Sequence, residues 1–205
     1  MRFSRTLGML ILACAVLCSA GPAFAQKSTK KKAAAPPDDK AATEAMMKAA
    51  TPGPEHKMLM SMVGTWKTSS KMWFAPGAPA TEATGESTIT SMLGGRFIQE
   101  NFKSEMMGMP FEGFGTTGYD NVQKKYVGTW SDNFGTGIMS TTGTYDAGTK
   151  TFTYTAKYPD PVTGKWKSMK IASKEVDANT QISEFWDEMP GGKLVKIMEI
   201  TYTRQ

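Results

Sequence analysis

MVGTWKTSSKMWF, residues 62–74, is the stretch of sequence that decides the fold. Apolar and polar side chains alternate along it, and one of its two faces is the more apolar. This alternation is typical of a half-buried β-strand, in which successive side chains point to opposite faces of the sheet. Further along, YVGTWSDNF at 126–134 repeats the Gly-Thr-Trp head and indicates a second strand of the same kind.

The alternation continues to the end of the chain and is interrupted by residues that favour tight turns. YDNVQKK, YDAGTK, DPVTGK and MPGGK each place Asp, Asn, Pro or Gly where the backbone must bend. The expected strands are 62–74, 84–93, 95–104, 112–119, 124–132, 137–145, 150–158, 165–176, 181–188 and 193–203. Short turns without intervening helices predict an all-β fold, an antiparallel up-and-down β-barrel of about ten strands. A two-sheet sandwich is the alternative, and a barrel of this size leaves room for a cavity.

The N-terminal part has a different composition. Residues 1–25 begin with a basic region, continue with an apolar run and end in Ala-Phe-Ala, which predicts a cleaved signal peptide and export to the periplasm or the medium. A retained membrane anchor is the alternative. Cys14 and Cys18 lie in this segment, so the mature chain is expected to lack disulfides and thiolate chemistry. Residues 26–40 are basic and low in complexity, and we expect a disordered tether there.

The remaining residues, 41–205, are expected to form one domain. It begins with a helix at 41–50, since AATEAMMKAA contains good helix formers, Asp38 or Asp39 can cap its start and TPGP ends it. The next residues, EHKMLMSMVG, are expected to form an apolar turn that leads into the first strand.

The charge distribution argues against a nucleic-acid partner. The formal net charge of the whole chain is +5, but the excess of Lys concentrates in KSTKKK at 27–32. Elsewhere basic and acidic residues are interleaved, which is unlike a nucleic-acid-binding surface. No later apolar run has the length of a transmembrane helix, so no transmembrane segment is expected in the mature chain.

A glycine two residues before a tryptophan, at the head of the first strand, resembles the calycin superfamily of lipocalins and fatty-acid-binding proteins. The resemblance implies that Trp66 closes one end of the barrel, that Arg204 on the last strand lies across its ring, and that Gly64 permits close backbone approach. A wider set of motifs is similar to a bacterial family, the domain of unknown function fifteen seventy-nine, over residues 43–205. These motifs are ATPGPEHKML, VGTW, LGGRFIQ, MMGMPFEGFGTTGYDN, KKYVGTWSD, GTGIM, GTYD and MEITYTR. This second resemblance implies a calycin-like barrel and no established activity.

Five residues are candidates for binding a ligand inside the barrel. Aromatic side chains supply apolar walls, and a polar group on an apolar strand face can anchor the head of a ligand. Two candidates are carboxylates on such faces, where burial is costly unless the group is paired. The candidates are Glu100, Trp130, Tyr154, Glu184 and Trp186. For Trp130 core filling is the alternative, and strand bulges that turn the two carboxylates outward are equally allowed.

No catalytic residue, metal site or cofactor is expected from the sequence. His56 is the only histidine, and no Gly-x-Ser-x-Gly elbow or zinc motif accompanies it, so we expect it to be structural. Met106, Met107 and Met109 cluster in SEMMGMPFEG. Thioether ligands select Cu(I), which makes copper binding an alternative to flexible packing over a cavity mouth.

The sequence therefore predicts an exported, non-enzymatic protein that binds a small apolar or amphipathic molecule in a barrel cavity. Three alternatives stay open. One is a filled barrel that acts as a structural or interaction protein in the cell envelope, and another is an isomerase- or hydrolase-type enzyme that uses a pocket carboxylate. The third is the copper site at Met106–Met109. Neither the identity of the ligand nor the oligomeric state follows from the sequence.

Overall fold

The structure of the protein is a computed structural model, and it describes residues 38–189 and 192–205. The predicted signal peptide at 1–25 and the predicted tether up to residue 37 lie outside the described residues. The helices are α1 (Asp39–Ala50) and α2 (Pro54–Met60). The strands are β1 (Gly64–Met72), β2 (Thr81–Met92), β3 (Phe97–Met106), β4 (Met109–Asp120), β5 (Lys125–Asp132), β6 (Met139–Asp146), β7 (Thr151–Pro159), β8 (Trp166–Asp177), β9 (Thr180–Glu188) and β10 (Leu194–Arg204).

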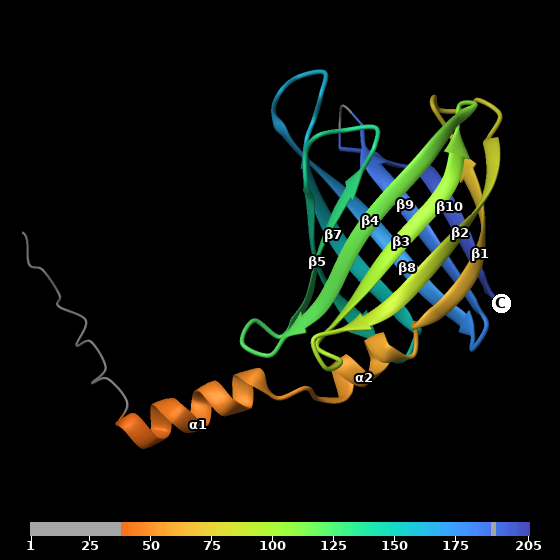
Figure 1. Cartoon of the computed structure of the whole chain (residues 1–205). Coiled ribbons are helices and arrows are strands. Elements are labelled where there is room, and N and C mark those ends of the chain that lie inside the picture. The colour runs from red at the N-terminus through yellow and green to blue at the C-terminus, as the bar shows by residue number, and fades with distance from the viewer. Residues whose placement is uncertain (1–37, 190–191) are drawn as a thin grey trace, which may run out of the picture. The chain divides into compact units, whose positions relative to one another are not determined.

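These strands form a closed antiparallel barrel, in which each strand pairs with its neighbours in sequence and β1 pairs with β10 (Figure 1). The prediction of an all-β, up-and-down barrel is confirmed, and the two-sheet sandwich is excluded. Every predicted strand limit lies within three residues of the observed one. Because each of the ten described strands has a partner on both sides, none leaves an open edge for association.

The stretch that opened the sequence analysis becomes β1. Trp66, Thr68, Ser70 and Met72 are buried, and the residues between them are exposed. This is the period of two expected for a strand with one face toward the interior. The inward face of β1 contains both polar and apolar side chains, so the barrel interior is not a purely apolar core.

The segment between α1 and β1 differs from the expectation. The residues expected to form an apolar turn contain a second helix, α2. Gly53 stands at its N-cap position and Pro54 at the first helical position, where a missing N–H costs nothing. Leu59 is fully buried, so this short helix is stabilised by packing beneath the barrel more than by its own hydrogen bonds.

Helix α1 begins earlier than expected and takes the last two residues of the predicted tether. The Asp38 carboxylate accepts a hydrogen bond of 2.7 Å from the backbone N–H of Ala41, which is the capping role expected for Asp38 or Asp39. The end of the helix is fixed to the barrel by side chains from two turns. Asn121 donates to the carbonyl groups of Ala49 and Thr51 at 3.0 and 2.8 Å, and the Arg96 guanidinium donates to that of Ala50 at 2.9 Å. Among the described helices, none has both the length and the apolar character needed to cross a membrane.

The two ends of the barrel are built differently. Helix α2 contacts β3 and β4 at the end where β1 starts and β10 stops, and we call this end the floor. The mouth, at the opposite end, is formed by connections that include 73–80, 107–108, 133–138 and 160–165. Figure 1 shows α2 beneath the strands and these connections at the far end.

A packed core fills the floor half of the barrel. Its buried members are Leu59, Trp66, Ile89, Ile98, Tyr126 and Phe152. Phe152 is fully buried, and the Tyr126 ring packs edge-on against it with the ring centroids 5.0 Å apart. Full burial of one such side chain contributes about 1.5–3 kcal/mol to stability.

Candidate ligand-binding cavity

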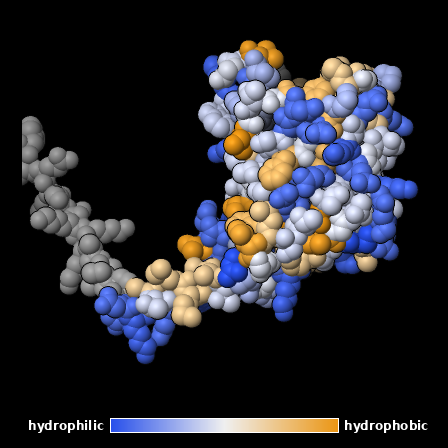
Figure 2. Space-filling view, viewed as in Figure 1, coloured by the Kyte–Doolittle hydropathy of each residue, from blue (hydrophilic) through white to orange (hydrophobic). Residues whose placement is uncertain are grey.

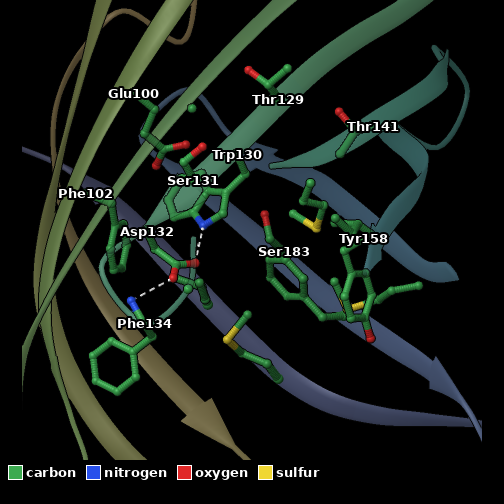
Figure 3. A pocket seen from close by; sticks show the side chains of 18 of the residues that line it. Glu100, Phe102, Thr129, Trp130, Ser131, Asp132, Phe134, Thr141, Tyr158 and Ser183 are labelled. Atoms are coloured by element: carbon green, nitrogen blue, oxygen red, sulfur yellow. Dashed lines mark hydrogen bonds between the residues drawn. The ribbon is translucent and has the colours of Figure 1, made fainter. Parts of the chain in front are cut away.

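Above this core the barrel is hollow. The cavity has a volume of about 830 Å³, and its lining runs from Trp66 near the floor to residues 134–138 of the mouth. Half of the lining residues are aromatic, aliphatic or methionine, and about a third are Ser, Thr, Gln, Asp or Glu. In Figure 3 the side chains of Glu100, Phe102 and Trp130 extend into the space that Ser183 and Tyr158 face from the other side. Such a concave site, more apolar than polar, is the usual form of a small-molecule site.

The floor beneath the cavity is closed by the pair of residues that the calycin resemblance implied. Trp66 and Arg204 are opposite each other in the β1–β10 ladder, and the guanidinium carbon lies 4.1 Å from the centroid of the indole. The guanidinium donates to the carbonyl groups of Val63 at 2.8 Å and Ser61 at 2.6 Å. Gly64 adopts a φ of +144°, and a Cβ there would lie 2.6 Å from Arg204 Nη1. Glycine is therefore needed for the guanidinium to reach this position.

Glu100 is the carboxylate deepest in the cavity. It lies on β3 close to the floor and deep inside the barrel. The residue is half-buried, because part of its surface borders the hollow. The Ser87 hydroxyl donates to Glu100 Oε1 at 2.7 Å, and Tyr202 from β10 also donates to the carboxylate. The structure therefore places Glu100 where the sequence predicted it, on the inward face with Ile98 and Phe102.

Burial decides the ionisation of this group. Removal from water raises the pKa of Glu100, because the charged form loses its hydration, and the hydrogen bonds from Ser87 and Tyr202 only partly counter this rise. The pKa of Tyr202 is raised well above its usual value by its own burial and then by the negative charge of Glu100. The two groups form one coupled polar site at the bottom of the cavity.

Trp130 lies flat along the cavity wall. It pairs with Gly115 across the β4–β5 ladder, and Cβ atoms at Gly113 or Gly115 would collide with its ring. Its indole N–H donates to Asp132 at 3.0 Å, so the ring is held in place at its polar edge as well. Trp130 thus lines the cavity, which is the ligand-facing position predicted for it and not that of a core-filling residue.

The wall opposite Glu100 carries an aromatic and a pair of hydroxyl groups. Tyr154 lines the cavity next to Phe152, with the two rings almost parallel and their centroids 6.0 Å apart. Burial raises the pKa of Tyr154, which keeps the phenol neutral. Ser173 and Ser183 share a hydrogen bond of 2.8 Å between their hydroxyl groups. This part of the wall therefore presents neutral hydrogen-bonding groups.

Two predicted ligand-binding residues are not brought to the cavity, and their placement corrects the expectation that they face inward. Glu184 and Trp186 lie on the outer face of β9, where Lys196 donates to Glu184 at 3.0 Å and lies 6.0 Å from the centroid of the Trp186 ring. The inward positions of this strand belong to Ser183 and Phe185. The outer wall in Figure 2 mixes polar and apolar side chains, as expected for a surface in contact with water.

His56 and the methionine cluster have different surroundings. His56 is buried in α2, its Nδ1 accepts a hydrogen bond of 3.0 Å from the Gly53 backbone, and its ring packs edge-on against Tyr119. These contacts fit the structural role expected for it. Met106 lines the cavity, whereas Met107 and Met109 are exposed at the tip of the β3–β4 hairpin. The structure thus spreads the cluster over a tight turn, and copper binding stays a prediction.

Sequence reasoning missed Ser87 and Tyr202, the two residues that hold Glu100. Tyr202 had a usable signal, because Ile200, Tyr202 and Arg204 alternate along the last strand and must share one face. Because Arg204 was expected to cover Trp66 at the floor, Tyr202 on the same face should have been expected to point into the barrel. Ser87 had no such signal, because its strand contains small polar residues on both faces.

Comparisons with known proteins agree with this architecture. The chain is similar in fold to the crystal structure of Rv2717c from M. tuberculosis, with a TM-score of 0.55 and 14% identity over 76% of this chain and 99% of that one. It is also similar to the S-type phycobiliprotein lyase CPES from Guillardia theta, with a TM-score of 0.50 and 10% identity over 78% of this chain and 96% of that one. At such identities the likeness shows the fold alone. No curated protein matches the sequence significantly. The model of the family described as "Protein of unknown function (DUF1579)" matches residues 51–204, and the chain therefore belongs to that family.

Proposed function

We propose that this protein binds a small apolar or amphipathic molecule in the barrel cavity and does not act as an enzyme. The observation that carries the proposal is the hollow itself, about 830 Å³ bounded mainly by aromatic, aliphatic and methionine side chains. A barrel filled by its own side chains would leave no such space. An apolar body would gain free energy by leaving water for this wall, and the polar groups would orient it.

The placement of Glu100 gives a specific reason to weigh the enzymatic alternative. A carboxyl group with a raised pKa in a cavity is suited to general acid–base chemistry. Such a mechanism also needs a free donor that stabilises the charge developing on the substrate, and the nearest hydroxyls, those of Ser87 and Tyr202, are already engaged with Glu100. These hydroxyls are donors to the carboxylate, so they support it as a binding group and leave binding as the function that the geometry favours.

Export belongs to the same proposal. The N-terminal 25 residues predicted as a signal peptide, and the basic segment after them, would deliver the barrel to the periplasm or the medium. There the barrel would meet small molecules that arrive from outside the cell or from the envelope.

The proposal is tested with N-phenyl-1-naphthylamine, an uncharged dye whose fluorescence rises in apolar surroundings. We expect saturable binding to the purified protein, with energy transfer from tryptophan. A matched pair of variants locates the site. Ile171→Trp fills the cavity, because Ile171 is buried and lines it, whereas Lys170→Trp adds the same side chain at the adjacent exposed position. Loss of binding in the first variant alone supports the cavity, and equal binding in both contradicts it.

Native mass spectrometry of the protein purified from its own host gives a second measurement. A retained adduct that the Ile171→Trp variant lacks would support the proposal and give the mass of the ligand. An adduct that both variants carry would place the bound molecule elsewhere on the chain.

A further inference from the structure

The charged groups that line the cavity are all of one sign. Glu100, Glu105, Asp132 and Asp160 border it, and among the described residues no Lys, Arg or His does. The excess of positive charge in the whole chain, formally +5, comes from residues before 38, and residues 38–205 contain 18 basic and 19 acidic residues. The part of the chain that forms the barrel is therefore close to neutral, and the cavity lining is more acidic than the barrel as a whole.

The four carboxylates occupy two levels, and those near the mouth have local partners. Asp132 accepts hydrogen bonds from the Trp130 indole and from the Phe134 backbone, both at 3.0 Å. Asp160 accepts from the backbone of Val162 and the hydroxyl of Thr163. Asp132 and Asp160 are therefore stabilised by hydrogen bonds within the connections at the mouth. Glu105 is exposed to water and needs no partner.

Glu100 lacks the partner that a buried carboxylate needs. The hydroxyls of Ser87 and Tyr202 donate to it, and donation to an oxygen supports the ionised form. Neither hydroxyl can neutralise the charge. Two lysines near the cavity are already paired with other carboxylates: Lys167, at the mouth end of β8, with Asp187, and Lys196, on the outer face, with Glu184 and Glu199. The site around Glu100 therefore contains hydrogen-bond donors for a carboxylate but, in the part of the chain that the structure describes, no positively charged partner for it.

We propose that the cavity selects a cationic amphiphile, whose ammonium group pairs with Glu100 while its apolar body lies along the wall of Phe102 and Trp130. This inference rests on the proposed function and names the class of ligand. An ammonium group brings the missing positive charge and N–H donors for the carboxylate. The face of the Trp130 ring, which borders the same space, attracts a cation further.

The same arrangement disfavours the other common head groups. A fatty acid would place a second carboxylate in the cavity beside Glu100, and two like charges there repel unless one of them takes a proton. A fatty alcohol can accept and donate hydrogen bonds but brings no charge. We therefore expect the order of affinity to be amine first, alcohol second and carboxylate last.

The test uses three compounds with the same tail, decylamine, decan-1-ol and sodium decanoate, below their micellar concentrations at neutral pH. Each is titrated against the purified protein by displacement of N-phenyl-1-naphthylamine and by calorimetry. We expect decylamine to bind at least about tenfold more tightly than decan-1-ol, and decanoate to bind most weakly. In Glu100→Gln the preference should collapse, so that the affinities for decylamine and decan-1-ol lie within about threefold of each other.

Glu184→Gln is the matched control, because it removes one carboxylate from the outer face of the barrel. It should leave the preference for decylamine unchanged. A wild-type protein that binds decan-1-ol or decanoate as tightly as decylamine overturns the proposal, as does a Glu100→Gln protein that keeps the preference. If Glu100→Gln does not fold, the order of the three compounds on the wild-type protein decides. Binding of the dye without a preference for the amine leaves the proposed function intact, whereas failure of the dye and all three compounds to bind removes both.

Discussion

The floor and the cavity of this barrel each contain a tryptophan from a Gly-Thr-Trp stretch, but the two tryptophans have different roles. At the floor, Trp66 is stacked by Arg204 and packed against Leu59, and hydrogen bonds fix the guanidinium. In the cavity, Trp130 lies against two glycines and exposes its other face to empty space. The two Gly-Thr-Trp stretches therefore begin alike and end in different environments. The lesson is that one half of the barrel contributes mainly stability and the other half leaves room for a ligand.

The largest effect is expected at the floor, from Arg204→Met. The variant loses the stacking on Trp66 and the charged hydrogen bonds to Val63 and Ser61, and it leaves their carbonyl groups short of donors. We expect the free energy of unfolding to fall by about 2–4 kcal/mol, measured by urea denaturation. Arg204→Lys is the control, since it keeps the charge but lacks the planar guanidinium. Its free energy of unfolding should lie between those of the wild type and Arg204→Met. A loss equal to that of a surface substitution would show that the floor is not closed in this way.

A smaller effect is expected on the cavity wall, from Gly113→Ala. The added Cβ would overlap the Trp130 ring, so the indole must leave the wall and enter the hollow. We expect a loss of about 1–3 kcal/mol in the free energy of unfolding, together with weaker dye binding and a shift in tryptophan emission. Gly135→Ala is the control, because the nearest heavy atom to its Cβ lies 4.0 Å away. Unchanged dye binding in Gly113→Ala would separate Trp130 from the ligand site.

The smallest effect is expected from Glu100→Gln, and it depends on pH. Because burial raises the pKa of Glu100 in the folded protein, the folded state binds more protons than the unfolded state once the pH exceeds the ordinary pKa of a glutamate. Wild-type stability should therefore fall, relative to the variant, as the pH rises from 4 toward 8. Urea denaturation at several pH values measures the difference, and Glu184→Gln controls for the loss of one negative charge. A constant difference between wild type and Glu100→Gln across this range would contradict the raised pKa.

The sequence was sufficient for the barrel because the signals were local. The alternation along each strand and the turn residues between strands are both visible in short stretches of sequence. An all-antiparallel meander can therefore be recognised without long-range information. Helix α2 was missed for the opposite reason. A helix of seven residues has little stability of its own, and it forms because Leu59 is buried beneath the barrel.

The candidate site was only partly predictable. Glu100 could be placed because the inward face of β3 has apolar residues on both sides of it, Ile98 and Phe102. Strand β9 has large aromatic residues on both faces, Phe185 inside and Trp186 outside, so the sequence does not say which face is inward. A choice of the wrong face moves every side chain of a strand to the other side, which is why Glu184 and Trp186 were expected together in the cavity.

Because the barrel has an even number of strands in up-and-down order, β1 begins and β10 ends at the same end of the barrel, the floor. The first and last strands are neighbours, and the backbone N–H of Gln205 donates to the carbonyl of Thr65 at 2.9 Å. A fluorescent protein or an immobilisation tag attached after Gln205 would therefore sit beside the sealed base and leave the entrance clear. The scaffold is suited to a surface-bound sensor in which every barrel presents its opening to the sample.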